Sequence, residues 1–173
     1  MEILLGCGSS RVKKLAWRGR SEWKNLVTLD HEATHKPDIV HDMNELPLPF
    51  DDDSADEIHA YEVLEHCGTQ GDYKFFFDQW QDFWRILKHG GVFLGSVPLA
   101  ESVWAWGDPS HTRLVTKEQF VFLHQPSYAQ VGVTPMSDFR SLFTGDFDLV
   151  HAAKTEHCLM FGLQAVKPAR IVL

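Results

Sequence analysis

Short apolar runs, each closed by a glycine, a proline or a polar residue, recur through the first hundred residues of the chain. Runs of this kind, bounded by turn-forming residues, are typical of buried strands. The pattern predicts strands at residues 3–5, 26–29, 38–41, 55–61 and 92–97. Pro47 and Pro49 interrupt the pattern, so residues 46–53 are expected to form a loop.

A helical pattern is clearest at residues 73–88, where apolar residues recur at steps of three and four and would share one face of a helix. The residues of this face are Phe76, Trp80, Phe83 and Leu87. Gly90 and Gly91 follow, and we expect them to cap the helix. Shorter helices are expected at about residues 11–24 and 117–123, with a long loop at 104–113.

The order of these elements predicts the fold class. Strands alternate with helical segments up to residue 97, which is typical of a parallel sheet with crossover helices. Two late strands, at 147–153 and 158–166, are joined by a short polar turn and should form an antiparallel hairpin. We therefore expect an α/β fold with a doubly wound, Rossmann-like sheet, mostly parallel, with a C-terminal antiparallel hairpin. The length fits a single domain over residues 1–173.

Composition places the chain among ordinary globular proteins. Hydrophobic residues make up 44% and charged residues 23%, and no apolar run reaches the roughly 18 residues that a membrane span needs. The first ten residues lack a basic segment followed by a long apolar stretch, so no signal peptide is expected. The cysteines contain no CxxC pair, which argues against a disulfide framework or a zinc finger. A cytoplasmic location without membrane contact is expected.

The charge balance disfavours a nucleic-acid partner. The formal net charge is −8, whereas proteins that grip phosphate backbones usually carry a basic face. The basic residues cluster once, and this cluster is more typical of a solvated surface than of a binding patch. It comprises Arg11, Lys13, Lys14, Arg18 and Arg20. We expect a small-molecule partner, and the sequence does not indicate an oligomeric state.

A glycine turn and an acid stand at the ends of the first two predicted strands. Gly6 and Gly8 allow the backbone to approach a ligand closely, and Asp30 follows 22 positions beyond Gly8, where a carboxylate can accept hydrogen bonds from ribose hydroxyls. This spacing suits a dinucleotide or an adenosyl cofactor. The dinucleotide fingerprint requires a third glycine where this chain has Arg11, which argues against a pyrophosphate ligand.

Several segments together resemble the class I S-adenosylmethionine-dependent methyltransferases, and in particular short bacterial and phage-type members. The resemblance covers residues 2–97. Its segments are ILLGCGSS, LVTLD, DIVHDMNELPLPFDDDSADEIHAYEVLEH and WRILKHGGVFLGSVP, in the order that the family has them. Two positions depart from the family pattern: Leu4 stands where many members have an acid, and Ser10 replaces a glycine.

The resemblance implies a cofactor site for S-adenosylmethionine. Gly6 and Gly8 would pass under the methionine part of the cofactor, with Cys7 between them, and Asp30 would hold the ribose, with His31 beside it. Asp42 would face the adenine amino group and Met43 would pack on the ring. Tyr61 and Glu62 would line the methionine and methyl end. These assignments concern Gly6, Cys7, Gly8, Asp30, His31, Asp42, Met43, Tyr61 and Glu62.

The acceptor side is expected in an insertion at about residues 99–140. Because a sulfonium is already activated, the protein has mainly to align the acceptor and exclude water, and a general base is needed only when the acceptor must lose a proton. His66 and His111 are the candidate catalytic bases, with Glu65 and Asp108 behind them. Aromatic side chains of the insertion could wall an acceptor pocket and attract the sulfonium. They are Trp104, Trp106 and Tyr128.

No metal site is expected, because neither the pair His31 and His35 nor the pair His59 and His66 matches a known ligand spacing. The segment after the fourth strand is also not the Asp/Asn-Pro-Pro-aromatic tetrad of DNA amino-methylating enzymes. We therefore predict a methyltransferase that acts on an oxygen or nitrogen of a small-molecule acceptor. Two alternatives remain: a non-catalytic, S-adenosylmethionine-binding partner subunit, which Leu4 favours, and a nicotinamide-dependent reductase, which Asp30 allows.

Overall fold

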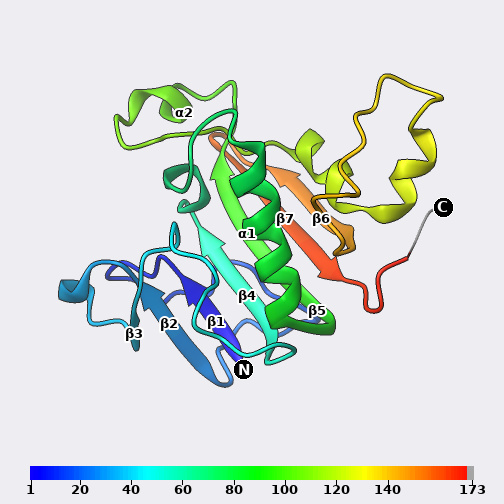
Figure 1. The fold of residues 1–173 in the computed structure, drawn as a ribbon. Helices are drawn as coiled ribbons and strands as arrows, with labels where there is room; N and C mark the ends of the chain where they lie inside the picture. The colour runs from blue at the N-terminus through cyan, green and yellow to red at the C-terminus, as the bar shows by residue number, and fades with distance from the viewer. Residues whose placement is uncertain (171–173) are drawn as a thin grey trace.

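A seven-stranded mixed sheet forms the centre of the computed structural model, which describes residues 1–170. Its strands are β1 (Glu2–Leu5), β2 (Leu26–Asp30), β3 (Ile39–Val40), β4 (Ala55–Tyr61), β5 (Leu87–Pro98), β6 (Phe147–Lys154) and β7 (Cys158–Ala165). They lie in the order β3-β2-β1-β4-β5-β7-β6 (Figure 1). Strands β1 to β5 are parallel, and β7 is antiparallel to both β5 and β6. The predicted fold class, including the C-terminal hairpin, is confirmed.

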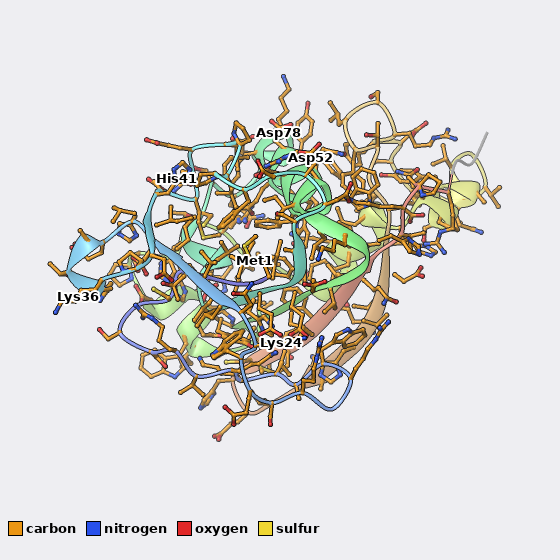
Figure 2. The ribbon with its side chains drawn as sticks, turned by 90° about the horizontal axis from the view of Figure 1, so that it is seen from below. Met1, Lys24, Lys36, His41, Asp52 and Asp78 are labelled. Atoms are coloured by element: carbon orange, nitrogen blue, oxygen red, sulfur yellow. The ribbon has the colours of Figure 1, made fainter. Side chains whose placement is uncertain are left out.

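The strand order places a topological switch point at β1. From β1 the chain builds outward to β2 and β3 on one side, and then returns to add β4 and β5 on the other. In an open α/β sheet, ligands bind in the crevice beyond the carboxyl ends of the strands at such a point. Figure 2, viewed from below, shows Met1 near the middle of the fold, with Lys36 and His41 toward the side of β3. The predicted glycine turn and Asp30 therefore meet at the same edge of the sheet.

One face of the sheet is covered by α1 (Tyr73–Ile86), which lies across it in Figure 1. Asp72 caps the start of the helix, because its carboxylate accepts a hydrogen bond from the Phe75 amide, and the helix ends where Leu87 becomes extended. Trp80 is buried against Phe93 of β5, with ring centroids 5.0 Å apart. The predicted face of the helix is confirmed for Trp80 and Phe83, which are buried, and Phe76 is partly buried. Leu87, predicted on the same face, instead begins β5, so the helix ends two residues before the predicted end at 88.

On the other face of the sheet, the structure differs from the sequence prediction of a helix. Residues 11–24, expected as a helix, form an irregular segment, because Arg18 and Gly19 adopt positive φ angles of 49° and 77°. An isolated bridge joins Trp17 to Arg20 across this turn. A helix cannot pass through two consecutive left-handed residues, so the segment crosses the sheet as a loop.

A buried polar network fills the space under this irregular segment. Glu57 of β4 pairs with the Lys13 ammonium at 2.7 Å and with the Arg20 guanidinium at 2.6 Å. Its carboxylate also lies 3.0 Å from Nε2 of His59, whose Nδ1 lies 2.6 Å from the Tyr61 hydroxyl. Burial alone would raise the pKa of Glu57, but His59 and Lys13 outweigh it and hold the pKa at about 2. Ion pairs to Glu57 therefore hold residues 11–24 on this face of the sheet, where a helix was expected.

Two smaller predictions also need correction. Gly90 and Gly91 do not cap a helix but lie inside β5, which begins at Leu87, and a Cβ on Gly91 would stand 3.0 Å from the Lys88 carbonyl oxygen. The expected loop at 104–113 contains a short helix, α2 (Val103–Gly107), beyond the carboxyl ends of the central strands in Figure 1. Single-turn and 3-10 elements complete the chain. They are η1 (Ala33–His35), η2 (Leu64–His66), η3 (Lys117–Leu123) and η4 (Gln125–Gln130).

No helix in the described part of the chain is long and apolar enough to cross a membrane.

Candidate functional site

The glycine turn after β1 is shaped by two left-handed glycines. Gly6 has a φ of 56° and Gly8 a φ of 50°. A Cβ on Gly6 would stand 2.1 Å from Cγ2 of Val63, so only glycine fits there, whereas a Cβ on Gly8 would meet no atom within 4 Å. Gly6 is needed for packing against the end of β4, and Gly8 leaves open space above the turn.

Asp30, at the end of β2, binds this turn directly. One carboxylate oxygen accepts a hydrogen bond from the Gly8 amide at 2.8 Å, and the other accepts one from the Glu32 amide at 2.9 Å. Each carboxylate oxygen has a second lone pair, so the acid can hold the turn and still accept hydrogen bonds from a ligand. His31 lies beside it, exposed, with Nδ1 3.5 Å from the Asp30 carboxylate.

Arg11 is a residue of this site that the sequence reasoning assigned no role. Its guanidinium donates to the Gly8 carbonyl at 2.7 Å and to the His35 carbonyl at 2.9 Å, and so joins the glycine turn to the loop after β2. The same side chain that argued against a pyrophosphate site therefore braces the turn. Its position directly after the turn was the only signal in the sequence.

A cavity of about 500 Å³ opens over the glycine turn and the ends of β2 and β4. Of the predicted cofactor residues, the structure gathers Gly6, Gly8, Asp30, His31, Asp42 and Met43 around it. The residues that the prediction did not include are His35, His41, Asn44, Val63, Cys67 and Ser110. His66, a predicted catalytic residue, also lines the cavity.

Asp42 and Met43 differ in how they face this cavity. Asp42 is exposed, and hydrogen bonds from the Asn44 amide and side chain lower the pKa of its carboxyl. Met43 is buried and belongs to the main core. The Asp42 carboxylate can accept a hydrogen bond from an amino group, and the apolar, polarisable side chain of Met43 lies next to it in the sequence. This pair of side chains suits an aromatic base that carries an amino group.

Two predicted cofactor residues turn their side chains elsewhere. Tyr61 and Cys7 are buried with Leu4 on the side of the sheet covered by residues 11–25. The Tyr61 hydroxyl is engaged there by His59 and by the Leu15 amide, which donates to it at 3.1 Å. This placement does not support contact between the Tyr61 side chain and a ligand in the cavity. Cys7 can offer only its backbone.

Glu62 follows β4 in a strained conformation. Its φ of 56° is unusual for a residue with a Cβ, and such strain is common at functional sites. One carboxylate oxygen accepts a contact from the Cys158 thiol at 3.5 Å, and the other is buried without a hydrogen-bond partner among residues 1–170. Glu62 is therefore held at the end of the sheet but outside the residues that line the cavity.

The two predicted catalytic histidines lie together, although 45 positions separate them. The His66 and His111 rings are 4.7 Å apart between centroids, with Glu65 beside them. The Thr112 amide brings the two segments together by donating to the Glu65 carbonyl at 2.9 Å. Burial, followed by the charge of Glu62, raises the pKa of Glu65 to about 8. Asp108 is more distant, with its carboxylate 3.9 Å from Nε2 of His111.

The predicted acceptor-binding aromatics are dispersed. Trp104 and Trp106 lie on α2 and are 59% and 70% exposed, whereas Tyr128 is 2% exposed and donates its hydroxyl hydrogen to the Phe122 carbonyl. Phe120 belongs to the core. The two tryptophans are exposed but do not line the cavity over the glycine turn, and Tyr128 is a buried packing residue of η4.

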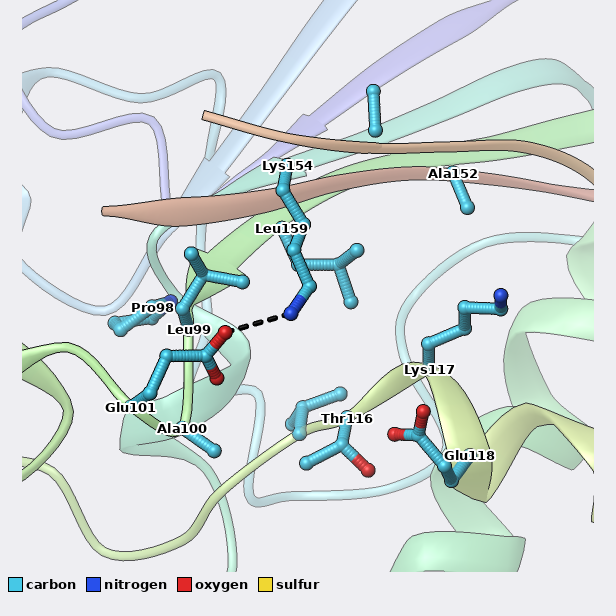
Figure 3. A pocket seen from close by; sticks show the side chains of 12 residues that line it. Pro98, Leu99, Ala100, Glu101, Thr116, Lys117, Glu118, Ala152, Lys154 and Leu159 are labelled. Carbon is cyan, nitrogen blue, oxygen red and sulfur yellow. Dashed lines mark hydrogen bonds and ion pairs between the residues drawn. The ribbon is translucent and has the colours of Figure 1, made fainter. Parts of the chain in front are cut away.

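A second hollow, of about 220 Å³, lies between residues 98–101 and 115–118 on one side and β6 and β7 on the other (Figure 3). Glu101 and Lys154 form an ion pair of 2.6 Å across it. It shares no lining residue with the cavity over the glycine turn. It borders the insertion in which the acceptor was expected.

Comparison with known proteins places this architecture in a family. Residues 4–95 match the model of a family described as methyltransferase domain. No curated protein matches the chain in sequence.

Solved structures resemble the fold along nearly the whole chain. The Haloferax volcanii methyltransferase in complex with the Trm112 methyltransferase activator has a TM-score of 0.55 at 17% identity, over 95% of this chain and 82% of that one. The N-methyltransferase NodS from Bradyrhizobium japonicum WM9 has a TM-score of 0.55 at 12% identity, over 96% and 85%. A SAM-dependent methyltransferase from Archaeoglobus fulgidus has a TM-score of 0.55 at 11% identity, over 94% and 85%.

The family match spans β1 to β5, which carry the glycine turn, Asp30 and Asp42, and the structural matches extend the likeness through the C-terminal hairpin. The chain therefore belongs to the methyltransferase-domain family and has the fold of the class I S-adenosylmethionine-dependent methyltransferases.

Proposed function

We propose that this protein transfers a methyl group from S-adenosylmethionine to an oxygen or nitrogen atom of a small-molecule acceptor. The observation that carries the proposal is the cavity at the switch point of the sheet, where Gly8, Asp30 and Asp42 converge. Asp30 would accept hydrogen bonds from the ribose hydroxyls, and Asp42 one from the adenine amino group, with Met43 beside the ring. The open space above Gly8 would take the methionine part.

The acceptor would meet the methyl group near His66, which lines the cavity, with His111 behind it. When the acceptor must lose a proton to attack, a neutral imidazole at this position can accept that proton. We expect the acceptor itself to lie against residues 99–140. We further propose that residues 1–173 form a single domain, of which this segment is an insertion. The exposed Trp104 and Trp106 are the acceptor's candidate contacts in that segment.

Calorimetric titration with S-adenosylhomocysteine tests the cofactor site. We expect binding by the wild-type protein and a loss of affinity of about 100-fold or more in Asp30→Ala, because two hydrogen bonds to a charged acceptor would be lost. Asp78→Ala removes an exposed acid of α1 and should leave the affinity unchanged. NAD is the competing ligand, and binding of NAD in preference to S-adenosylhomocysteine would favour a reductase. A folded wild-type protein that does not bind S-adenosylhomocysteine would refute the proposal.

A second candidate function is a non-catalytic, cofactor-binding partner subunit. Leu4, where many members of the family have an acid, is buried with Tyr61 and Cys7 and offers the cofactor no polar group. Transfer of a labelled methyl group to a panel of hydroxyl and amine compounds separates the two functions. Cofactor binding without transfer to any of them would favour the partner subunit.

A further inference from the structure

Three side chains beside the cavity bring potential metal ligands together. Glu65, His66 and His111 each place one donor atom within 4.8 Å of the others. Glu65 and His66 come from η2, directly after β4, and His111 comes from the segment that follows α2. The hydrogen bond from the Thr112 amide to the Glu65 carbonyl fixes the two segments against each other. Glu65 and His66 are neighbours in the sequence, and the fold brings the distant His111 to them.

Both imidazoles are oriented as metal-binding histidines usually are. Nδ1 of His66 lies 3.2 Å from the Ser110 carbonyl oxygen, and Nδ1 of His111 lies 3.3 Å from the Ala105 carbonyl oxygen. A carbonyl oxygen only accepts, so Nδ1 of each ring donates the hydrogen, and in a neutral ring Nε2 then keeps a lone pair that can bind a metal. A histidine that ligates a metal almost always donates its other ring N–H to a carbonyl or carboxylate in this way.

Glu65 supplies an independent observation. Its side chain is 2% exposed, and neither carboxylate oxygen has a hydrogen-bond partner in the described part of the chain. Buried carboxylates are normally hydrogen-bonded, paired with a charge or bound to a metal. Arg113 lies nearby, but its guanidinium donates to the Leu64 carbonyl and to Gln79. The acid is thus left facing the two imidazoles without a partner of its own.

We propose that Glu65, His66 and His111 bind a divalent transition-metal cation. Two imidazole nitrogens and one carboxylate favour zinc or a neighbouring first-row metal over magnesium, which prefers oxygen ligands and keeps its water. In a tetrahedral zinc site the ligand atoms are roughly 3.3 Å apart, so separations that now lie within 4.8 Å need to shorten by no more than about 1.5 Å on binding. Three protein ligands leave one position open, and Asp108, 3.9 Å from His111, is close enough to approach it.

The cation would change the role of the two histidines. An imidazole that binds a metal through Nε2 cannot also take a proton there, so neither would act as the general base. A cation that binds an acceptor hydroxyl would lower the pKa of that hydroxyl, so that its proton passes to solvent water. The oxygen then forms its bond to the methyl carbon as the sulfur–methyl bond breaks, and S-adenosylhomocysteine leaves. This part of the inference rests on the proposed methyl transfer, and it favours an oxygen acceptor over a nitrogen one. Metal binding itself does not depend on it.

The test uses the full chain, stripped of metals with a chelator and then titrated with ZnCl₂ by calorimetry. We expect one Zn²⁺ to bind per chain with a Kd at or below about 1 μM, a range that calorimetry resolves. Glu65→Gln keeps the size of the side chain but removes the anionic ligand, and His111→Asn removes an imidazole. Each variant should bind Zn²⁺ at least about 10-fold more weakly. CoCl₂ should give visible absorption in the wild-type protein that both variants lose.

Matched controls make the result specific. The chain has 10 histidines, so His151→Ala, which removes an exposed imidazole of β6, should leave the affinity and the cobalt absorption unchanged. Circular dichroism confirms that each variant is folded. The proposal is overturned if the folded wild-type protein binds no Zn²⁺, or if Glu65→Gln and His111→Asn bind it as tightly as the wild type. Titration with S-adenosylhomocysteine is separate, so failure of the cofactor site and failure of the metal site are distinguishable.

Discussion

Alanine at the two glycines of the turn after β1 should affect the protein differently: Gly6→Ala should mainly reduce stability, and Gly8→Ala should mainly reduce cofactor affinity. Both adopt left-handed conformations, so alanine at either position should cost about 1–2 kcal/mol of backbone strain. At Gly6 the new methyl group would also stand 2.1 Å from Cγ2 of Val63, and forced overpacking adds about 1–3 kcal/mol. At Gly8 it would meet nothing within 4 Å. We expect a destabilisation of about 2–5 kcal/mol for Gly6→Ala and about 1–2 kcal/mol for Gly8→Ala.

Urea unfolding followed by circular dichroism measures both values, and a thermal melt should shift by roughly 2–4 °C for each kcal/mol in a domain of this size. Calorimetry with S-adenosylhomocysteine measures the affinity of the folded variants. Gly8→Ala would place its methyl group in the space that the cofactor would occupy, so we expect it to reduce this affinity more than Gly6→Ala does.

A double-mutant cycle isolates the predicted contact. Val63→Ala removes Cγ2 and Cγ1, which would stand 2.1 Å and 3.3 Å from a Cβ on Gly6, and leaves the Val63 Cβ at 2.8 Å. Gly6→Ala should therefore be at least about 1 kcal/mol less costly in that background than in the wild type. Equal destabilisation by Gly6→Ala and Gly8→Ala, or strict additivity with Val63→Ala, would show that the packing at the turn is not the reason for Gly6.

Two further predictions concern the two faces of the sheet. Glu57 has a pKa of about 2 in the folded protein, below its ordinary value of 4.5, so the stability that its ionised form contributes is complete above pH 4.5 and is lost as the pH falls toward about 2. Glu57→Gln should destabilise the protein by about 3 kcal/mol or more at pH 7, because it leaves Lys13 buried with one partner fewer. In urea unfolding at a series of pH values, the free energy of unfolding of this variant should fall less than that of the wild type between about pH 4.5 and pH 2. If the stability of Glu57→Gln depended on pH as that of the wild type does, the ionised Glu57 carboxylate would not be the source of this stability. Trp80→Ala should cost about 3–5 kcal/mol in the same unfolding assay, since Trp80 is buried among the rings of α1 and β5, and a loss below about 1 kcal/mol would contradict this packing.

Part of the site could be predicted because it depends on chain order. Gly6, Gly8 and Asp30 each stand at the carboxyl end of a strand, and a parallel sheet brings such ends to one edge whatever the details of packing. Alternation along β4 held a further signal that was not used. Glu57, His59 and Tyr61 share one face, so the tyrosine belongs with the buried polar network and not with the cavity.

The sequence by itself determined the fold class, most strand positions, most of α1 and the cofactor edge, because periodicity and turn residues act over a few neighbouring positions. It did not determine the start of β5, which lies at Leu87 and not at residue 92. Only the tertiary structure decided how residues 11–24 cover the sheet, since their shape follows from the ion pairs that Lys13 and Arg20 make with β4. It also decided that His111 meets His66, through a backbone hydrogen bond between segments 47 positions apart. Contacts between residues that are far apart in the sequence leave no local pattern of hydrophobic and polar positions, so only the folded structure shows them.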